Sequence, residues 1–493
     1  MIDPTLFASG AATGMIDLSQ LDDLQKALTA GYGTDVSTLT GGAALRIQSL
    51  DATMQATIQQ NEDFRLFNRL SKPHAGATVD EWTEMSNVGG FLGGTTNTET
   101  GVINPYTGTY NRRVGLVKYL MTQRQVSLVQ TLQNAIADSE AIEYSNGALQ
   151  LLTDAEYLCF EGDSTVVPTE FDGIYAQMNG GINAGLVDPR NIVNAQGTAL
   201  SNVAIINTAA AQIRGYGNFG RPTDIFMSLL TQADFDTGLD PAFRVPLNNV
   251  PNGGLEIGAP VTGIRTSHGN IKTNDDIFIR DEEMKQPFET SFSTIANANI
   301  GLQPASIVAA APVSNVASNF TAPQAGNYYY AVSGQNAAGQ STVLVSSQVA
   351  ISAGQSVTLT ITRSAGALET GYVLYRSRLN GSNVVAGSVA GQGSDFREMV
   401  RIPNAGATST YVDTNFDMPG TSKAFVLNMT AGMTAITWRQ LLPMVKFPLY
   451  PTNSAVIPWA QLLFGYLRIS KRRQHVVIKN VLPNGALWRP FNT

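Results

Sequence analysis

The chain has 493 residues, a formal net charge of −7 and only 14% charged residues, against a usual share of about 25%. This length is too great for one hydrophobic core, so we expect two or more domains. The acidic balance argues against a surface that attracts nucleic acid as a whole, and a single cysteine excludes an internal disulfide framework. Low charge with abundant Gly and Ala favours an assembly subunit.

The first part of the chain predicts an arm and then a long hairpin. Residues 1–62 are mostly small and polar with short helical patterns, which indicates an N-terminal arm. Within residues 63–125, an ascending strand over 79–85 and a descending strand over 112–121 flank a stretch rich in Gly, Thr and Asn. A compact domain rarely keeps so long a loop unless the loop acts outside its own core, so we expect a projection.

A long helix is predicted directly after the hairpin, within residues 126–165. From Ser127 to Glu161 apolar residues recur at gaps of three, four and seven, which places one apolar stripe along the helix. At about 1.5 Å per residue, roughly 30 residues give a rod of about 45 Å. Cys159 lies on this stripe, so we expect a buried structural thiol rather than a nucleophile.

Residues 166–303 predict a mixed α+β domain. A helix is expected over 202–214 and an apolar strand over 223–228. Further strands are expected over 261–266 and 276–280.

The composition changes at residue 304 and changes back at residue 425. Residues 304–424 are poor in charge and predict short strands at near-regular spacing, the pattern of an all-β sandwich. Residues 425–493 return to the earlier style and complete the host domains. The sequence therefore predicts a sandwich inserted into an α+β host.

Motifs that would carry chemistry are weak. The stretch 215–220 matches G-x-G-x-x-G, but a helix precedes it and a strand follows, the reverse of the dinucleotide-binding order, so we interpret it as a helix-to-strand turn. His74, His268 and His475 share no metal-ligand spacing, and no nucleophile elbow occurs. We expect no enzyme, no catalytic residue, no cofactor and no metal.

Two groups of residues are candidates for contacts with other molecules. A few cations on one face attract phosphate in a salt-dependent way, so the basic cluster could contact DNA, and inter-subunit ion pairs are the alternative that we favour. The basic cluster contains Arg468, Lys471, Arg472 and Arg473. The inter-subunit candidates on the hairpin are Pro105, Tyr106, Tyr110, Arg112 and Arg113.

The order of arm, hairpin, long helix and mixed domain resembles the major capsid proteins of tailed bacteriophages, which have the HK97-type fold. Over about residues 1–300 and 425–493, local phrases are similar to that family as well. The phrases lie at residues 155–163, 171–174, 222–228, 459–467 and 475–481. Residues 304–424 resemble a fibronectin type III or immunoglobulin-like domain, most clearly at 326–341 and 371–377.

The resemblance implies an α+β fold with an N-terminal arm, an E-loop hairpin, a spine helix and an axial domain. It implies self-assembly, in hexamers and pentamers, into the icosahedral head shell that encloses double-stranded DNA. Implied partners are copies of the chain, a separate scaffolding protein, a portal, decoration proteins and weakly held DNA. Some family members cross-link a lysine to an asparagine, but residues 89–111 contain no lysine and Lys118 is the nearest, so we expect non-covalent locking.

We expect the chain to be found in the virion after assembly in the host cytoplasm. It shows no signal peptide and no run of about 18 apolar residues, so no membrane partner is expected. Three alternatives stay open. An encapsulin-like cellular shell would have similar subunits, an adhesin or carbohydrate-binding protein would use the sandwich, and an enzyme would need polar groups that converge in space.

Overall fold

The computed structural model describes residues 64–132, 138–201, 203–238, 261–282, 300–385, 394–430, 435–451 and 454–491. The N-terminal arm expected over residues 1–62 lies outside these ranges. Internal contacts divide the chain into two units, one of residues 1–59 and 134–138 and one of residues 60–133 and 139–493. All helices and strands given below belong to the second unit.

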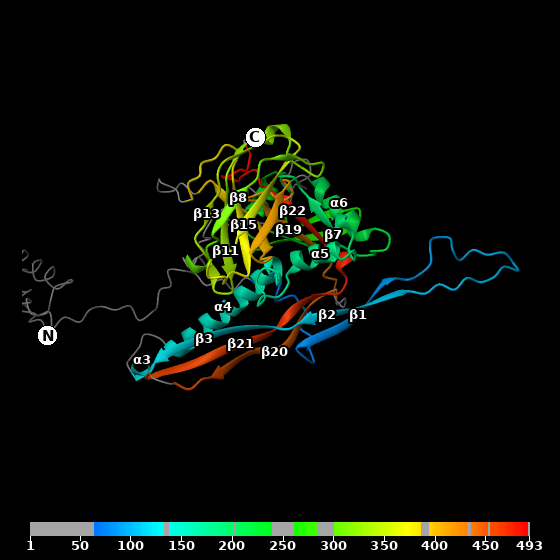
Figure 1. The fold of residues 1–493 in the computed structure, drawn as a ribbon. Coiled ribbons are helices and arrows are strands. Elements are labelled where there is room, and N and C mark those ends of the chain that lie inside the picture. Colours follow the sequence, from blue (N-terminus) through cyan, green and yellow to red (C-terminus); the bar gives the residue numbers. More distant parts are fainter. Residues whose placement is uncertain are drawn as a thin grey trace, which may run out of the picture. The chain divides into compact units, whose positions relative to one another are not determined.

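The predicted hairpin is present (Figure 1). Strand β1 (Val79–Asn87) pairs with the antiparallel strand β2 (Thr109–Leu116) and a long loop joins them. The expectation of one descending strand over 112–121 is wrong, because the chain changes partner at Val117. This buried residue donates its N–H to the Thr78 carbonyl, and the following strand β3 (Lys118–Ser127) pairs with a different strand.

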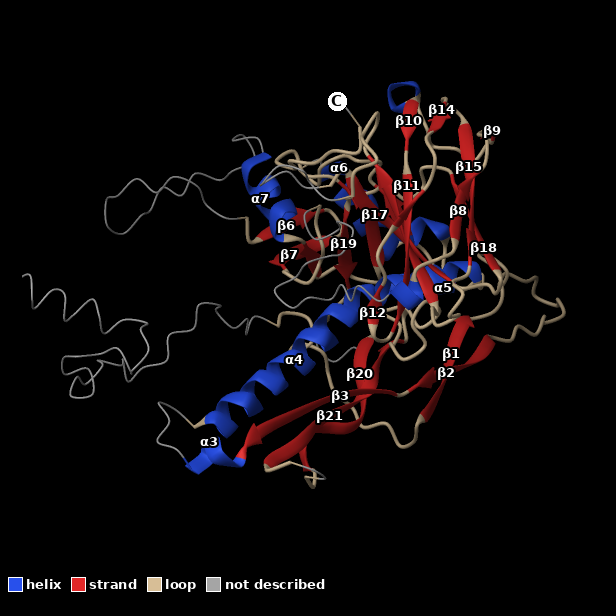
Figure 2. Ribbon diagram, turned by 60° about the vertical axis from the view of Figure 1, so that its left-hand side comes forward, coloured by secondary structure: helices blue, strands red, loops and turns tan. Residues whose placement is uncertain are grey.

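Strand β3 belongs to a sheet, here called the spine sheet, whose centre is β21 (Val456–Ile469) and whose other strand is β20 (Ile436–Pro448). The helix α4 (Ser139–Glu161) contacts β3 and β21 along one face of this sheet (Figure 2). The helix predicted to run without a break from Ser127 is wrong in its first part. Ser127 closes β3 opposite Val456, and a separate short helix α3 (Leu128–Leu132) follows.

A second sheet, here called the mixed sheet, joins strands from distant parts of the chain. Its order is β4 (Ile192–Asn194), β22 (Val476–Val481), β19 (Ser422–Leu427), β5 (Asp224–Met227), β7 (Gly269–Asp275) and β6 (Gly263–Thr266). The associated helices are α5 (Ile174–Asn183), α6 (Val203–Arg214) and α7 (Leu229–Gly238), with 3-10 turns η3 (Pro189–Asn191) and η7 (Arg472–Gln474).

Two sequence interpretations around the mixed sheet have clear outcomes. The turn expected over 215–220 is confirmed, since it connects α6 to β5. The strand expected over 276–280 is wrong, because β7 ends at Asp275 and the Asp276 carboxylate then accepts the Phe278 N–H at 2.9 Å. An aspartate that binds the backbone two residues on closes a turn rather than extending a strand.

Residues 300–413, which interrupt the mixed sheet between β7 and β19, are rich in short strands; we call them the β-rich segment. Strands β11 (Tyr330–Asn336), β16 (Gly371–Ser377) and β17 (Phe396–Pro403) form one sheet, and β8 (Ser306–Ala309), β15 (Gln355–Thr362) and β18 (Thr408–Asp413) form another. The smaller elements are β9 (Val313–Ser314), β10 (Gly326–Tyr328), β12 (Gly339–Gln340), β13 (Leu344–Val345), β14 (Val349–Ile351), η5 (Ile300–Leu302) and η6 (Ala322–Gln324).

The described residues bury several hydrophobic cores. One lies between α4, the spine sheet and the mixed sheet, and it includes Cys159, whose predicted burial is confirmed. Another lies within the β-rich segment, where side chains from both of its larger sheets meet, among them Val332 and Leu359. These separate cores match the expectation from length that one core would not suffice. No described helix is long and apolar enough to cross a membrane.

Buried polar contacts connect the β-rich segment to helix α4. The Arg401 guanidinium on β17 donates to the Tyr157 hydroxyl at 2.9 Å and to Glu398 at 2.9 Å. Arg280 lies over the Tyr157 ring, 4.6 Å from its centroid. Because these charged groups are largely withdrawn from water, their mutual pairing fixes the geometry of this junction more firmly than a surface ion pair would.

Candidate assembly surface

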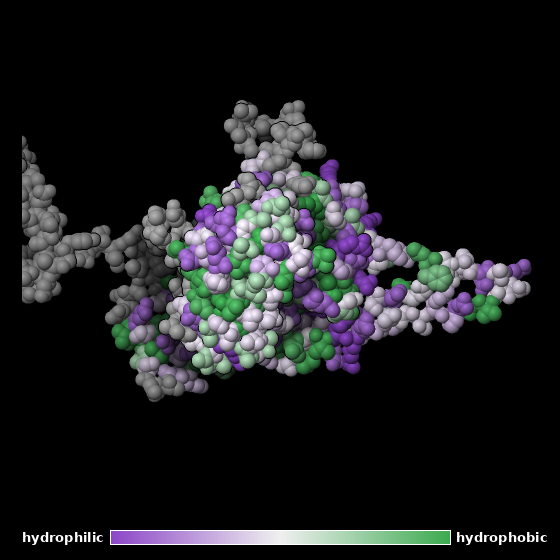
Figure 3. Space-filling view, turned by 45° about the horizontal axis from the view of Figure 1, so that its top comes forward, coloured by the Kyte–Doolittle hydropathy of each residue, from purple (hydrophilic) through white to green (hydrophobic). Residues whose placement is uncertain are grey.

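The loop of the hairpin, residues 88–108 and here called the arm loop, exposes large apolar side chains. Val102 and Ile103 are 84% and 87% exposed, and Phe91 and Leu92 are also exposed. Figure 3 shows such hydrophobic side chains along the arm loop, among hydrophilic ones. Apolar groups gathered on a thin loop indicate a contact surface, since the loop has no core of its own in which to bury them.

The arm loop nevertheless has a defined course. The Tyr106 ring meets the Phe91 ring edge-on with centroids 6.1 Å apart, and its hydroxyl donates to the Gly94 carbonyl at 3.1 Å. At the foot of the loop Gly89 has φ of 92°, and a Cβ there would lie 2.5 Å from the Thr107 carbonyl oxygen. Only glycine suits this position, because side chains are strained at such a φ and this one would also collide with backbone.

The hairpin candidates named from the sequence lie in two different settings. Pro105 and Tyr110 are exposed, and Tyr106 is partly covered by its own loop. Arg112 forms an exposed ion pair with Glu81, whereas Arg113 lies 3.4 Å from Glu84 and is mostly covered. The exposed pair contributes little to stability, so these residues are available for other contacts.

The spine sheet has a second exposed apolar surface, on the side opposite α4. Tyr119 lies across from Phe464 and Met121 across from Leu462 in the β3–β21 register. The rings of Tyr119 and Phe464 meet edge-on at 4.9 Å, and Met121 is 63% exposed. On β20, Phe447 is also exposed. We call these side chains the open face. None of the candidates named from the sequence belongs to it, because Tyr119, Leu120 and Met121 follow one another without the alternation that predicts a half-buried strand.

Arg468, one of the four basic candidates, belongs to a network that fixes the foot of the hairpin. Asp80 on β1 accepts hydrogen bonds from Arg439 at 2.8 and 3.0 Å and from the Tyr466 hydroxyl at 2.6 Å. Arg468 lies 3.6 Å from the same carboxylate and over the Trp82 ring. Burial alone would raise the pKa of Asp80, but these hydrogen bonds and charges hold it below its usual range.

The other three basic candidates, Lys471, Arg472 and Arg473, line a pocket of about 240 Å³ at the foot of the arm, here called the basic pocket. Arg113, which the sequence placed in a separate group, lines it too. Arg473 donates to the Leu186 carbonyl at 3.1 Å and to the Ser86 carbonyl at 3.5 Å. The structure therefore brings together two basic groups that lie some 360 positions apart in the sequence.

Arg472 is the least satisfied cation of the basic pocket. Its side-chain stem lies against Gly181, and burial lowers the pKa of its guanidinium. Among the residues that the structure describes, its buried Nε has no hydrogen-bond partner. Within the same described ranges, no group of three His, Cys, Asp or Glu side chains could hold a metal ion.

Comparison with known proteins places this arrangement in a class. No family model matches the chain. Curated relatives are major capsid proteins of bacteriophages, and they match nearly the whole chain. Those of Staphylococcus phage S25-3 and Staphylococcus phage K are each 27% identical over 480 residues, which cover 93% of this chain and 95% of theirs.

Among solved structures, the chain is similar to the capsid of the native GTA particle, with a TM-score of 0.46, 9% identity, and coverage of 91% of this chain and 100% of that one. It is also similar to the SrpI encapsulin of Synechococcus elongatus PCC 7942, with a TM-score of 0.39, 8% identity, and coverage of 93% and 99%.

The resemblance to phage major capsid proteins that the sequence indicated is confirmed by the curated relatives. The fold class is confirmed as well. The described elements follow the α+β order of the HK97-type fold, with a long hairpin, a long helix and then a mixed sheet. That the β-rich segment is of the immunoglobulin or fibronectin type stays a prediction.

Proposed function

We propose that this chain is the major capsid protein of a tailed phage and assembles with itself into the icosahedral shell around the double-stranded DNA genome. The observation that carries this proposal is the similarity to phage major capsid proteins over 93% of the chain. The role is structural, without an enzymatic reaction. Because the curated relatives are phage capsid proteins, they favour a phage shell over the encapsulin-like alternative.

Assembly uses the arm loop, which in this proposal lies on a neighbouring copy. The counterpart that fits by chemistry is the open face, since Tyr119, Met121 and Phe447 offer apolar surface of the same kind. Fully burying each of four large apolar side chains of the loop contributes about 1.5–3 kcal/mol, from which the cost of ordering and association is subtracted. Because loop and face are unlike patches, the contact is heterologous and closes into rings.

The remaining parts follow from the same proposal. Residues 1–62 are an N-terminal arm, 63–125 the E-loop region, 126–165 the spine helix, and 166–303 with 425–493 the axial and peripheral domains. Residues 304–424 are an immunoglobulin-like or fibronectin-like insertion that reinforces contacts between capsomers or touches the host surface. Scaffolding, portal and decoration proteins are further partners, DNA is held weakly, and assembly occurs in the host cytoplasm.

A shortened arm tests the proposal. Since Asn87 pairs with Thr109 at the end of the hairpin, residues 88–108 can be replaced by Asn-Gly, a two-residue turn that joins antiparallel strands well. We expect the wild type to form capsomers or shells in sedimentation velocity, and the shortened chain to stay folded but unassembled.

A variant with a loop of full length separates the effect of loop length from the effect of the apolar side chains. Replacing Phe91, Leu92, Val102 and Ile103 by Ser keeps the loop length but removes four of its exposed large apolar side chains. We expect this variant to need a much higher protein concentration to assemble than the wild type. Assembly of the shortened chain at the wild-type concentration would contradict the role of the arm.

A further inference from the structure

The arm loop carries a single charged residue. Of residues 88–108 only Glu99 is ionisable at neutral pH, and it is exposed within a stretch of Thr, Asn and Gly. It forms no ion pair with any residue that the structure describes. A lone carboxylate on an otherwise uncharged contact loop places a single charge at one point of the loop. A cation on the partner opposite that point fixes how the loop lies, even where the apolar contacts would allow several positions.

The basic pocket has an excess of positive charge. Its lining contains four cations, Arg113, Lys471, Arg472 and Arg473, and a single carboxylate, Glu84. Glu84 is 3.4 Å from Arg113 and accepts the Trp82 indole N–H at 2.8 Å, and its charge also acts on Arg472, so one carboxylate faces all four cations.

Two of these cations are free to bind an anion from outside. Arg473 is already held by backbone carbonyls, whereas Lys471 is exposed at the pocket and Arg472 has a buried Nε without a partner in the described ranges. The charges of Glu84 and Asp172 act on Arg472 from a distance, but no carboxylate in the described ranges forms an ion pair with it, and an incoming carboxylate would supply that direct contact.

We infer that Glu99 on the arm of one copy binds Arg472 and Lys471 in the basic pocket of a second copy. This inference rests on the proposed function and names the polar end of its arm contact. The arm loop begins at the basic pocket of its own chain and extends away from it, because Ser86 and Asn111 at the end of the hairpin line that pocket. About ten residues of extended chain reach roughly 33 Å, so the tip meets a pocket on the next copy.

A carboxylate fits the basic pocket better than nucleic acid does. A recess of about 240 Å³ accepts one side chain, whereas a duplex needs an open, continuous basic surface. The chain as a whole is acidic, with a net charge of −7, which also disfavours DNA as the occupant. In a ring, each pocket receives the tip of one neighbour, so every copy is used once as donor and once as acceptor.

Cysteine cross-linking tests the pairing directly, because the only native cysteine, Cys159, is buried. Full-length Glu99→Cys chains and Lys471→Cys chains are mixed, assembled and oxidised, so that a disulfide between the two kinds can form only between copies. We expect a product of twice the chain mass on a non-reducing gel. In the control mixture Lys471→Cys is replaced by Asn207→Cys, an exposed position on α6, and we expect no such product.

Charge reversal gives an independent readout. Glu99→Lys cannot disturb a core, since Glu99 is exposed, and we expect it to raise the concentration needed for assembly by about tenfold or more, the change that about 1.4 kcal/mol produces. Asn207→Lys adds a charge at an exposed position on α6, outside the arm loop, the basic pocket and the β-rich segment, and should leave that concentration unchanged.

The outcomes separate this inference from the proposed function. Wild-type particles that form while neither the cross-link nor the Glu99→Lys effect is seen would overturn the pairing alone. A wild type that never assembles would overturn both. Loss of DNA retention in Lys471→Glu particles without a cross-link would assign the basic pocket to phosphate and also overturn the pairing.

Discussion

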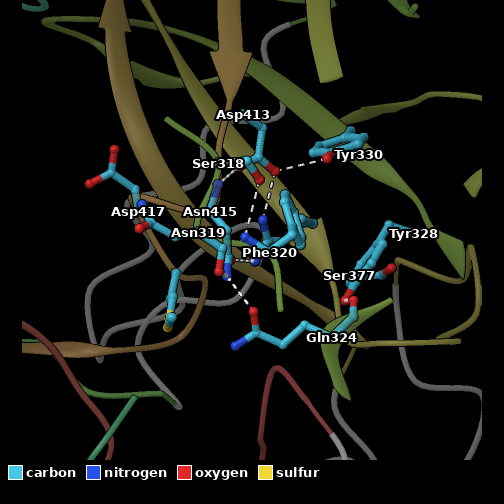
Figure 4. Close-up of polar contacts among 12 residues, drawn as sticks. Ser318, Asn319, Phe320, Gln324, Tyr328, Tyr330, Ser377, Asp413, Asn415 and Asp417 are labelled. Carbon is cyan, nitrogen blue, oxygen red and sulfur yellow. Dashed lines mark hydrogen bonds and ion pairs between the residues drawn. The ribbon is translucent and has the colours of Figure 1, made fainter. Parts of the chain in front are cut away.

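Asp413 is the counter-ion of a fully buried arginine in the β-rich segment, and its replacement by Ala tests what stabilises that segment. The Arg376 guanidinium donates to Asp413 at 2.6 Å and to the Asn415 side-chain oxygen at 2.6 Å. The Tyr330 hydroxyl donates to the same Asp413 carboxylate at 2.8 Å. Figure 4 shows Tyr330, Asp413 and Asn415 converging, with Phe320 beside them.

The magnitude follows from the burial of this pair. Both side chains are 0% exposed, so Asp413→Ala leaves the Arg376 charge in the core without its counter-ion. Breaking a buried pair in this way costs about 3–5 kcal/mol. Without Asp413 burial lowers the pKa of Arg376, but the ordinary pKa of an arginine is so high that the guanidinium keeps its proton, and the cost cannot be avoided by neutralisation.

The assay is hydrogen exchange of the full chain, read on peptides from residues 300–413. We expect the opening free energy of these peptides to fall by about 3–5 kcal/mol in Asp413→Ala, while peptides from α4 change less. The matched control is the double variant Arg376→Met with Asp413→Leu, which removes both charges and should recover much of the loss. A loss below about 1 kcal/mol in the single variant would refute the reasoning, because that is the size of an ordinary hydrogen bond.

Three further predictions concern the host core. Burial raises the pKa of Asp276 to about 8 and also raises the pKa of Glu156, with which Asp276 interacts. The pKa of Asp276 in the unfolded chain is near 3.8. The folded state therefore holds the proton more tightly than the unfolded state does, and this contribution to stability is lost as the pH rises towards 8. The thermal midpoint should therefore fall between pH 6 and pH 9 in the wild type and fall less in Asp276→Asn, and equal slopes would contradict this. Gly465→Ala should lower the unfolding free energy by about 1–3 kcal/mol in a urea titration, because its Cβ would lie 2.6 Å from ring atoms of Trp438; an unchanged midpoint would mean that the ring can shift. Cys159 is fully buried and burial raises its pKa, so it should react with a thiol reagent only after denaturant is added, and rapid labelling of the native chain would contradict its placement.

Local sequence signals predicted the elements that depend on their own residues. The helix expected over 202–214 is α6, Val203–Arg214, because Ile206, Ala210 and Ile213 form one buried face. The strand expected over 223–228 is β5, Asp224–Met227, which is fully buried and apolar from Ile225 to Met227. In both cases the periodicity and the burial coincide.

The errors arise where a distant partner decides the structure. Residues 118–127 have no alternation of apolar residues, and they form a strand because β21 pairs with them, with Val456 opposite Ser127. No signal within the segment announces a partner more than 300 residues away, so tertiary pairing overrides the local preference. The arm was predicted from composition. That Arg113 lines the same pocket as Arg472 depends on how the foot of the hairpin packs against the rest of the chain, and the spacing of the two residues in the sequence carries no signal for it.

Whether copies of this chain assemble with one another is best measured by sedimentation velocity with negative-stain electron microscopy of the wild-type protein. We expect closed shells, or hexamers and pentamers, from the chain alone or with its candidate scaffolding partner. A protein that sediments as a folded monomer under both conditions would contradict this expectation.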